Sequence, residues 1–266
     1  MIVLGVIQGL TEFFPVSSKG HLALGERLLG VDLHTSDELA TEIALHVGTL
    51  LAVALFVWRD IAMLVKLPVQ ATSPAAAPAR SLLLRMVIAT IPAAVVGLLF
   101  KADLESTYSD PRFAGAGFLV TATALLVARR IRHGTATATG QTVLSALLIG
   151  LAQMCALVPG VSRSGSTIVA GLAVGLARPE AGRFSFLIAL PITAGAILLE
   201  APAVLELPRD QLGAVGIGIV ASFVTGLFAL RFLIRMLRND TFWRFAWYLI
   251  PLGVWALLGL PGAPNN

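Results

Sequence analysis

The stretch from Val143 to Gly165 reads VLSALLIGLAQMCALVPGVSRSG, an apolar run that stops at Pro159 and turns through polar residues. A bilayer core of about 30 Å needs roughly 20 apolar residues in one helix, so Val143–Val158 is too short to cross it. A weaker apolar segment, Thr167–Leu176, follows the turn. A helix that stops, turns and restarts predicts a re-entrant hairpin, because irregular backbone at membrane depth is tolerated only where protein or water covers it.

A stretch near the N-terminus has the same organisation. Ile2–Phe14 is apolar and short, Pro15 ends it, and the polar turn PVSSKG leads to a second weak segment, Leu22–Leu29. At an offset of 145 positions the two stretches are identical at six sites. These are Gly5/Gly150, Gln8/Gln153, Val16/Val161, Ser17/Ser162, Gly20/Gly165 and Gly30/Gly175.

The composition of the whole chain fits a membrane protein. Of its 266 residues 57% are apolar and 13% are charged, about half the usual ~25%. Such a chain lacks the polar residues to surface a soluble domain, and it is equally unsuited to disorder or nucleic-acid binding. The single Cys155 excludes an internal disulfide, and no cationic flank precedes the first apolar stretch, so no cleavable signal peptide is expected. We expect one integral membrane domain over residues 1–266.

Six further apolar segments are close to the length of a membrane span. They are Ala40–Trp58, Leu82–Phe100, Phe113–Ala128, Phe184–Leu199, Leu212–Leu230 and Phe242–Leu260. The sequence therefore predicts an all-α polytopic membrane protein with six transmembrane helices and two re-entrant helical hairpins. Each hairpin precedes three spans, an odd number, so the two halves, about 1–132 and 141–262, insert in opposite orientations. This is an inverted-topology repeat, with its site where the broken helices meet.

The connecting loops predict the orientation of the chain. Loops 59–81, 129–142 and 231–241 are rich in Lys and Arg, and they alternate with loops that are not. The positive-inside rule places these three loops in the cytoplasm. Both chain ends then face outward, with the first hairpin entering from outside and the second from inside.

Polar residues gather at the two turns, where ionisable groups at membrane depth indicate a functional site. Gln8 and Glu12 share a helix face, as do Glu42 and His46 in the first span, and the remaining candidates follow in the turns. These are Ser17, Ser18, His21, Ser162, Arg163, Ser164 and Thr167. The guanidinium of Arg163 suits phosphate, and hydroxyls where a helix restarts favour an anion.

The acidic residues point to more than anion binding. Glu12 and Glu42 fit either a divalent cation that bridges them to phosphate oxygens or a general base. His21 can transfer a proton near neutral pH. Acid, base, cation and hydroxyl together favour phosphoryl transfer. A secondary transporter or flippase of a lipid-linked or anionic substrate is the main alternative, because inverted repeats with broken helices are typical of transporters. The turn around Ser162 does not match the nucleophile elbow of a serine protease.

Two long motifs resemble the signatures of the bacitracin-resistance family, the undecaprenyl-diphosphate phosphatases. They are QGLTEFFPVSSKGHL, from Gln8 to Leu22, and PGVSRSG, from Pro159 to Gly165. EIALHVGTLLAV, from Glu42 to Val53, and FSFLIALP, from Phe184 to Pro191, are also similar. The resemblance covers nearly the whole chain in order.

The resemblance implies hydrolysis of undecaprenyl diphosphate to undecaprenyl phosphate and inorganic phosphate, recycling the lipid carrier of cell-wall synthesis. It implies a divalent cation, Mg²⁺ or Ca²⁺, and a multi-pass protein of the bacterial inner membrane whose site opens to the periplasm. The expected partners are undecaprenyl diphosphate and membrane lipids, without nucleic acid. The sequence does not distinguish a monomer from a homodimer.

The expected site residues fall into three groups. The catalytic candidates are Glu12, Ser17, Ser18 and His21; the phosphate-binding candidates are Gln8, Ser162, Arg163, Ser164, Gly165 and Thr167; the metal candidates are Glu12 and Glu42. The sequence does not distinguish between Ser17, Ser18, His21 and an activated water as the nucleophile. Many family members carry Glu at the position of Gln8, and a neutral amide is a poor base and a weaker Mg²⁺ ligand. The acid–base and metal functions then shift to Glu12, or to Glu12 together with Glu42.

Overall fold

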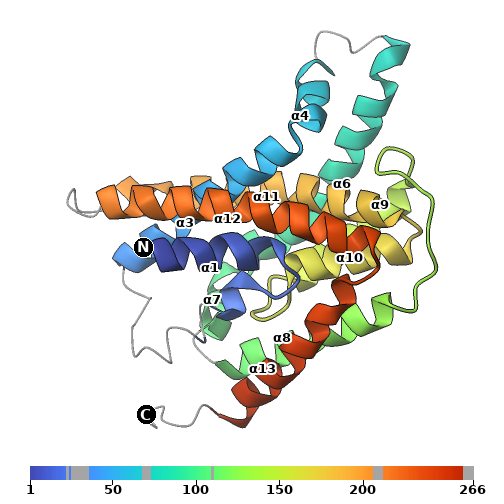
Figure 1. Ribbon diagram of the computed structural model, residues 1–266. Helices are drawn as coiled ribbons and strands as arrows, with labels where there is room; N and C mark the ends of the chain where they lie inside the picture. The colour runs from blue at the N-terminus through green and yellow to red at the C-terminus, as the bar shows by residue number, and fades with distance from the viewer. Residues whose placement is uncertain (22–23, 25–35, 68–72, 109–110, 206–211, 260–266) are drawn as a thin grey trace.

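The computed structural model describes residues 1–21, 24, 36–67, 73–108, 111–205 and 212–259 (Figure 1). The regular elements in these ranges are helices, and an isolated parallel bridge joins Ala136 to Leu176. In chain order they are α1 (Ile2–Phe13), α3 (Ser36–Phe56), α4 (Trp58–Val65), η1 (Pro74–Ala76), α6 (Ala77–Leu99), α7 (Lys101–Tyr108), α8 (Pro111–Ala128), α9 (Val143–Cys155), α10 (Arg163–Ala173), α11 (Arg178–Leu205), α12 (Leu212–Arg238), η2 (Phe242–Phe245) and α13 (Ala246–Leu258).

The lengths and compositions of these helices confirm a polytopic all-α membrane protein. Within the described ranges, Ala77–Leu99, Arg178–Pro202 and Leu212–Arg238 are each long and apolar enough to cross a membrane. The bent pair α3 and α4 adds a fourth if it counts as one span. The expected spans Phe113–Ala128 and Phe242–Leu260 coincide with shorter apolar helices. The count of six spans therefore stays a prediction.

Both expected interruptions are present next to the prolines. α1 ends at Phe13 and α9 at Cys155, close to the expected limits. The helix after the second turn starts at Arg163, four positions before the expected Thr167, because the Ser162 hydroxyl caps it by accepting from the Gly165 amide at 3.1 Å. The expected segment Leu22–Leu29 lies outside the described residues except for Leu24.

The region after the first span differs from the expected loop. α3 ends at Phe56, and the chain bends by 77° into α4, which begins at Trp58, the last residue of the expected first span, and continues into the stretch 59–81 expected to be a loop. The bend brings Asp60 into the protein interior, where it pairs with Arg183 of α11. A local hydrophobicity pattern does not report this pairing, because its partner lies far away in the sequence. α7 likewise forms in the stretch expected to be the next loop.

The helices form a bundle with a crossing pair at one side (Figure 1). α1 lies along α12, α3 contacts both α11 and α12, and α9 lies along α6. α8 and α13 pack against each other and cross this bundle, while α4 and the start of α6 project from it. The interior is filled by large side chains such as Phe118, Phe184 and Phe186, each nearly inaccessible. Apolar side chains are also exposed on the outside, which suits a lipid environment.

Glycines allow the closest helix contacts. A Cβ at Gly5 of α1 would lie 3.0 Å from Ala221 Cβ and closer still to the backbone oxygen of Gly218 on α12. Small residues let transmembrane helices approach in this way, and the approach gains van der Waals contact that lipid does not replace. The position of α1, and with it of the first turn, depends on this contact.

We predict that Gly5→Ala lowers the thermal unfolding midpoint of the purified protein, because the added methyl overpacks the contact between α1 and α12. Overpacking costs about 1–3 kcal/mol. Gly216→Ala is the matched control, since a Cβ there meets no atom within 4 Å. Equal midpoints for the two variants in the same detergent would contradict the close packing of α1.

Candidate active site

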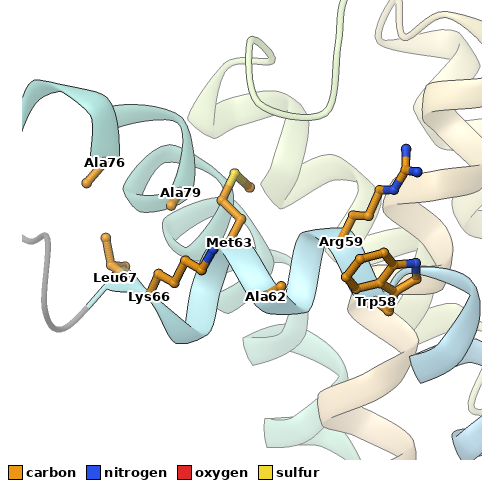
Figure 2. Close-up of a pocket in the computed structure, with 8 residues that line it drawn as sticks. All are labelled: Trp58, Arg59, Ala62, Met63, Lys66, Leu67, Ala76 and Ala79. Atoms are coloured by element: carbon orange, nitrogen blue, oxygen red, sulfur yellow. The ribbon is translucent and has the colours of Figure 1, made fainter.

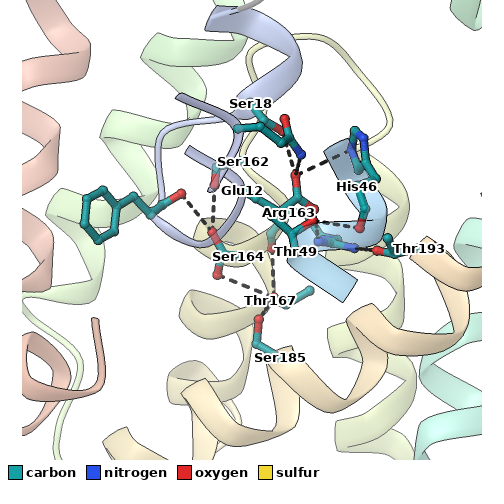
Figure 3. A network of polar contacts seen from close by, with 12 residues as sticks. Glu12, Ser18, His46, Thr49, Ser162, Arg163, Ser164, Thr167, Ser185 and Thr193 are labelled. Atoms are coloured by element: carbon teal, nitrogen blue, oxygen red, sulfur yellow. Dashed lines mark hydrogen bonds and ion pairs between the residues drawn. The ribbon is translucent and has the colours of Figure 1, made fainter. Parts of the chain in front are cut away.

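Glu12, in the last turn of α1, is the centre of a polar cluster between the two interrupted helices (Figure 3). Its Oε2 accepts hydrogen bonds from Gln8 Nε2 at 3.1 Å and from Ser18 Oγ at 2.9 Å. Its Oε1 is paired with the guanidinium of Arg163. The Glu12 side chain is 8% exposed, so protein groups rather than water stabilise its charge.

Arg163 links three helices at this point. It is the first residue of α10, its Nη2 pairs with Glu12 of α1, and its Nη1 donates to Thr193 Oγ1 of α11 at 2.8 Å. The helix dipole of α10 adds positive potential at the same place. A guanidinium held at a helix N-terminus can bind a second anion beside or in place of Glu12.

Hydroxyl and backbone contacts join the two turns directly. Ser164 Oγ donates to the carbonyl of Phe14 at 3.1 Å and lies 3.2 Å from Ser162 Oγ. Gly165 permits the approach, because a Cβ there would already lie 3.3 Å from Pro15 Cβ. The structure thus brings Glu12 and Ser18 of the first motif together with the second motif, whose contributing residues are Ser162, Arg163 and Ser164.

Other contacts hold the second turn against its neighbours. The Ser162 amide donates to Thr121 Oγ1 of α8 at 2.9 Å. The Thr121 hydroxyl in turn donates to the Gly160 carbonyl at 3.1 Å. Thr167 Oγ1 lies 2.6 Å from Ser185 Oγ and attaches α10 to α11. These hydroxyls act within the protein, so the side chain at this turn with the strongest capacity for phosphate is that of Arg163.

Ser17 and His21 face a different side of the first turn. Ser17 adopts a φ of +67°, and its Oγ accepts from the Gly20 amide at 3.4 Å. His21 Nδ1 bonds the Ser17 carbonyl at 2.7 Å, and its Nε2 lies 2.8 Å from the Tyr248 hydroxyl of α13. The His21 ring also stacks on Tyr248 and meets Phe118 edge-on. Both nitrogens of His21 are thus engaged away from Glu12.

His46 is a cluster member that the list of expected site residues omitted. Its Nδ1 bonds the backbone carbonyl of Glu42 at 2.9 Å, and its Nε2 lies 3.7 Å from Glu12 Oε2 (Figure 3). The spacing of Glu42 and His46 indicated a shared face, but the partner of the imidazole across the fold had no local signal. Thr193, Thr121 and Tyr248 were missed for the same reason, since each comes from a separate helix.

In the described ranges, no three His, Cys, Asp or Glu side chains are grouped to hold an ion. Glu12 is the carboxylate at the centre of the cluster, whereas the backbone carbonyl of Glu42 bonds His46, whose Nε2 lies 3.7 Å from Glu12 Oε2. A cation at Glu12 would need further oxygen ligands, which a bound diphosphate provides.

The fold and this site define a multi-pass membrane protein with a buried acid, an arginine and a serine between two broken helices. The chain belongs to the family described as bacitracin resistance protein BacA, whose model matches residues 1–255.

Similar proteins cover almost the whole chain. It is 39% identical over 263 residues to the undecaprenyl-diphosphatase of Alkaliphilus metalliredigens, covering 95% of this chain and 94% of that one. It is 37% identical over 271 residues to the undecaprenyl-diphosphatase of Salinibacter ruber, covering 96% and 98%. The undecaprenyl-diphosphatase of Acidiphilium cryptum is 37% identical over 273 residues, covering 98% and 97%. The expected family resemblance is confirmed.

We predict that Thr121→Val destabilises the second turn, because it leaves the Ser162 amide and the Gly160 carbonyl without their shared partner. An unsatisfied buried group costs about 1–3 kcal/mol, which a lower thermal unfolding midpoint would report. Thr123→Val, two positions along α8, is the control, because Thr123 is exposed and bonds only within its own helix to the Leu119 carbonyl. A Thr121→Val protein as stable as Thr123→Val would show that this hydroxyl is dispensable.

Proposed function

We propose a residue-level route for the hydrolysis of undecaprenyl diphosphate to undecaprenyl phosphate and inorganic phosphate. This is the reaction of the family to which the chain belongs and of relatives that match it over nearly its full length. The chain is an undecaprenyl-diphosphate phosphatase embedded in a membrane. The observation that supports our route is that Glu12 contacts both Arg163 and the Ser18 hydroxyl at the junction of the two turns.

Arg163 binds the outer phosphate in this route. Its guanidinium is oriented by Thr193 and balanced by Glu12 when no substrate is bound. A phosphate oxygen replaces part of the Glu12 contact, so the arginine remains paired throughout. The dipole of α10 favours the same anion. Because Arg163 has a fixed charge, it also stabilises the charge that spreads over the phosphoryl oxygens in the transition state.

Ser18 is the nucleophile and Glu12 its general base. Ser18 Oγ already donates its hydrogen to Glu12 Oε2 at 2.9 Å, the range required for proton transfer. As Oγ attacks the outer phosphorus, Glu12 takes the proton, and the bond to the bridging oxygen breaks to release undecaprenyl phosphate. Water then attacks the phosphoserine and passes a proton to a phosphate oxygen, while the proton on Glu12 returns to Ser18 Oγ, so that inorganic phosphate leaves as dihydrogen phosphate.

Ser17 and His21 support the turn rather than the reacting atoms. Ser17 accepts the Gly20 amide, and His21 joins the Ser17 carbonyl to Tyr248 of α13. These contacts hold the backbone on which Ser18 stands. We therefore assign His21 a positioning role, in place of the proton transfer that the motif alone favoured.

We further propose a divalent cation, Mg²⁺ or Ca²⁺, held by Glu12 and by oxygens of the diphosphate. Gln8 lies in the same cluster, where its amide nitrogen Nε2 donates to Glu12 Oε2, and its neutral amide oxygen is available as a further ligand. When bound, the cation would neutralise phosphate charge and polarise the bond to the leaving group. Glu42 is a weaker candidate ligand, because its link to the cluster is its backbone carbonyl, which bonds His46 of the same helix, and His46 makes the contact with Glu12.

We propose the full architecture of six spans, two re-entrant hairpins and an inverted repeat on the basis of reciprocal packing. α1 of the first half packs along α12 of the second, and α9 of the second packs along α6 of the first. Gly5 meets α12 as Gly150 meets Ala89 of α6. With basic loops in the cytoplasm, the first hairpin enters from the opposite side, and the site opens to the periplasm of the bacterial inner membrane.

We expect Ser18→Ala to reduce phosphate release from undecaprenyl diphosphate by at least about 100-fold, because it removes the attacking oxygen. Ser17→Ala keeps that oxygen and should stay within about tenfold of the unaltered protein, since it removes only a turn contact. Initial rates in detergent, with unfolding midpoints measured alongside, separate the two. Comparable losses in both variants would overturn the assignment of Ser18.

Glu12→Gln should abolish release even at saturating substrate, and EDTA should do the same to the unaltered protein until Mg²⁺ or Ca²⁺ is restored. Glu200→Gln is a control carboxylate, because its partner Lys101 lies at the surface. Release that persists in both Glu12→Gln and EDTA would reject the base and the cation together.

A further inference from the structure

A groove lies between α4 and the start of α6, outside the Glu12 cluster (Figure 2). Its cavity volume is about 290 Å³. The α4 side consists of two rows at helical spacing, Trp58, Ala62 and Lys66 in one row and Arg59 and Met63 in the other. Ala76 and Ala79 close the opposite side. The groove is open because the alanine side chains are small, and the longer side chains of Trp58, Arg59, Met63 and Lys66 form its border.

The position of α4 suits the surface of a membrane. The 77° bend after α3 turns α4 away from the direction of the span. Trp58 stands at this bend with 56% of its surface exposed, and Val65 at the far end is 69% exposed. Tryptophans gather at membrane–water interfaces because the indole has an apolar body and a polar N–H. The apolar side chains of α4 therefore meet lipid at interface depth.

The exposed charge of α4 is positive. Asp60 is the acidic residue of this helix, and it is buried and paired with Arg183, whose Nε donates to Asp60 Oδ2 at 3.0 Å. Arg59 and Lys66 border the groove and are exposed. The Arg59 guanidinium lies 5.8 Å from the centre of a Trp58 ring. The groove thus presents two cations beside apolar walls.

We propose that this groove binds an anionic phospholipid, with its phosphate between Arg59 and Lys66 and an acyl chain against Met63 and the alanines. Such a lipid satisfies both features at once, because its headgroup complements the cations and its chain covers the apolar walls. A soluble anion would complement the cations but leave the apolar walls of the groove, Met63 and the alanines, uncovered. Arg59 and Lys66 belong to the basic stretch 59–81, which the positive-inside rule assigns to the cytoplasmic side, where anionic lipids attract Lys and Arg near the surface.

The test is native mass spectrometry of the full chain in detergent, titrated separately with phosphatidylglycerol and with phosphatidylcholine. Arg59→Gln combined with Lys66→Gln should weaken phosphatidylglycerol binding by about tenfold or more, from the loss of two interfacial cations. Ala62→Phe should weaken it as well, because it fills the groove without a change in charge. Neither variant should alter phosphatidylcholine binding by more than about twofold, since zwitterionic lipid lacks the net charge.

The matched control is Arg235→Gln combined with Arg238→Gln, which removes the same charge from exposed positions at the end of α12. Binding to this variant should remain as in the unaltered protein. An equal loss in both double variants, or unchanged binding in Ala62→Phe, would reduce the effect to net charge and overturn the site. Displacement of the lipid by millimolar glycerol 3-phosphate would overturn the lipid assignment in favour of a soluble anion.

Discussion

The ion pair between Glu12 and Arg163 is the constraint around which this protein is built. Two charged groups inside a membrane protein are costly unless each is paired and hydrogen-bonded. Here the carboxylate has Gln8 and Ser18 as further donors, and the guanidinium has Thr193. Because the partners come from α1, α10 and α11, the pair forms only when both interrupted helices reach the same point.

The broken helices are a requirement of the same chemistry. Continuous helices would place only side chains in the interior, whereas a break exposes a helix start and polar backbone to a ligand. The two breaks are stabilised by each other, through Ser164 and Phe14, and by α8, through Thr121. Glycines at the contacts of α1 with α12 and of α9 with α6 let both short helices lie deep in the bundle. The site is thus a property of the interface between the halves of the chain.

The surface of the protein is suited to contact with lipid. A phosphatase whose substrate is a lipid must receive it from the bilayer, and the exposed apolar side chains of the long helices provide that contact. α4 differs from these helices, because the buried pair of Asp60 and Arg183 leaves it with exposed cations and an aromatic anchor. Because the carboxylate of Asp60 is buried, the exposed surface of α4 carries only the positive charges of Arg59 and Lys66.

The sequence by itself determined the membrane class and both breaks, and it predicted most residues of the Glu12 cluster, because apolar run length, prolines and clustered polar residues are local signals. It also indicated the family through two long motifs. Only the tertiary structure decided that Ser18 rather than Ser17 faces Glu12, that His21 turns to Tyr248 and that His46 joins the cluster. The bend before α4 was also decided only by the tertiary structure, since Asp60 of α4 has its partner, Arg183, on α11. These choices depend on the rotation and depth at which distant helices pack, and no local pattern in the chain encodes them.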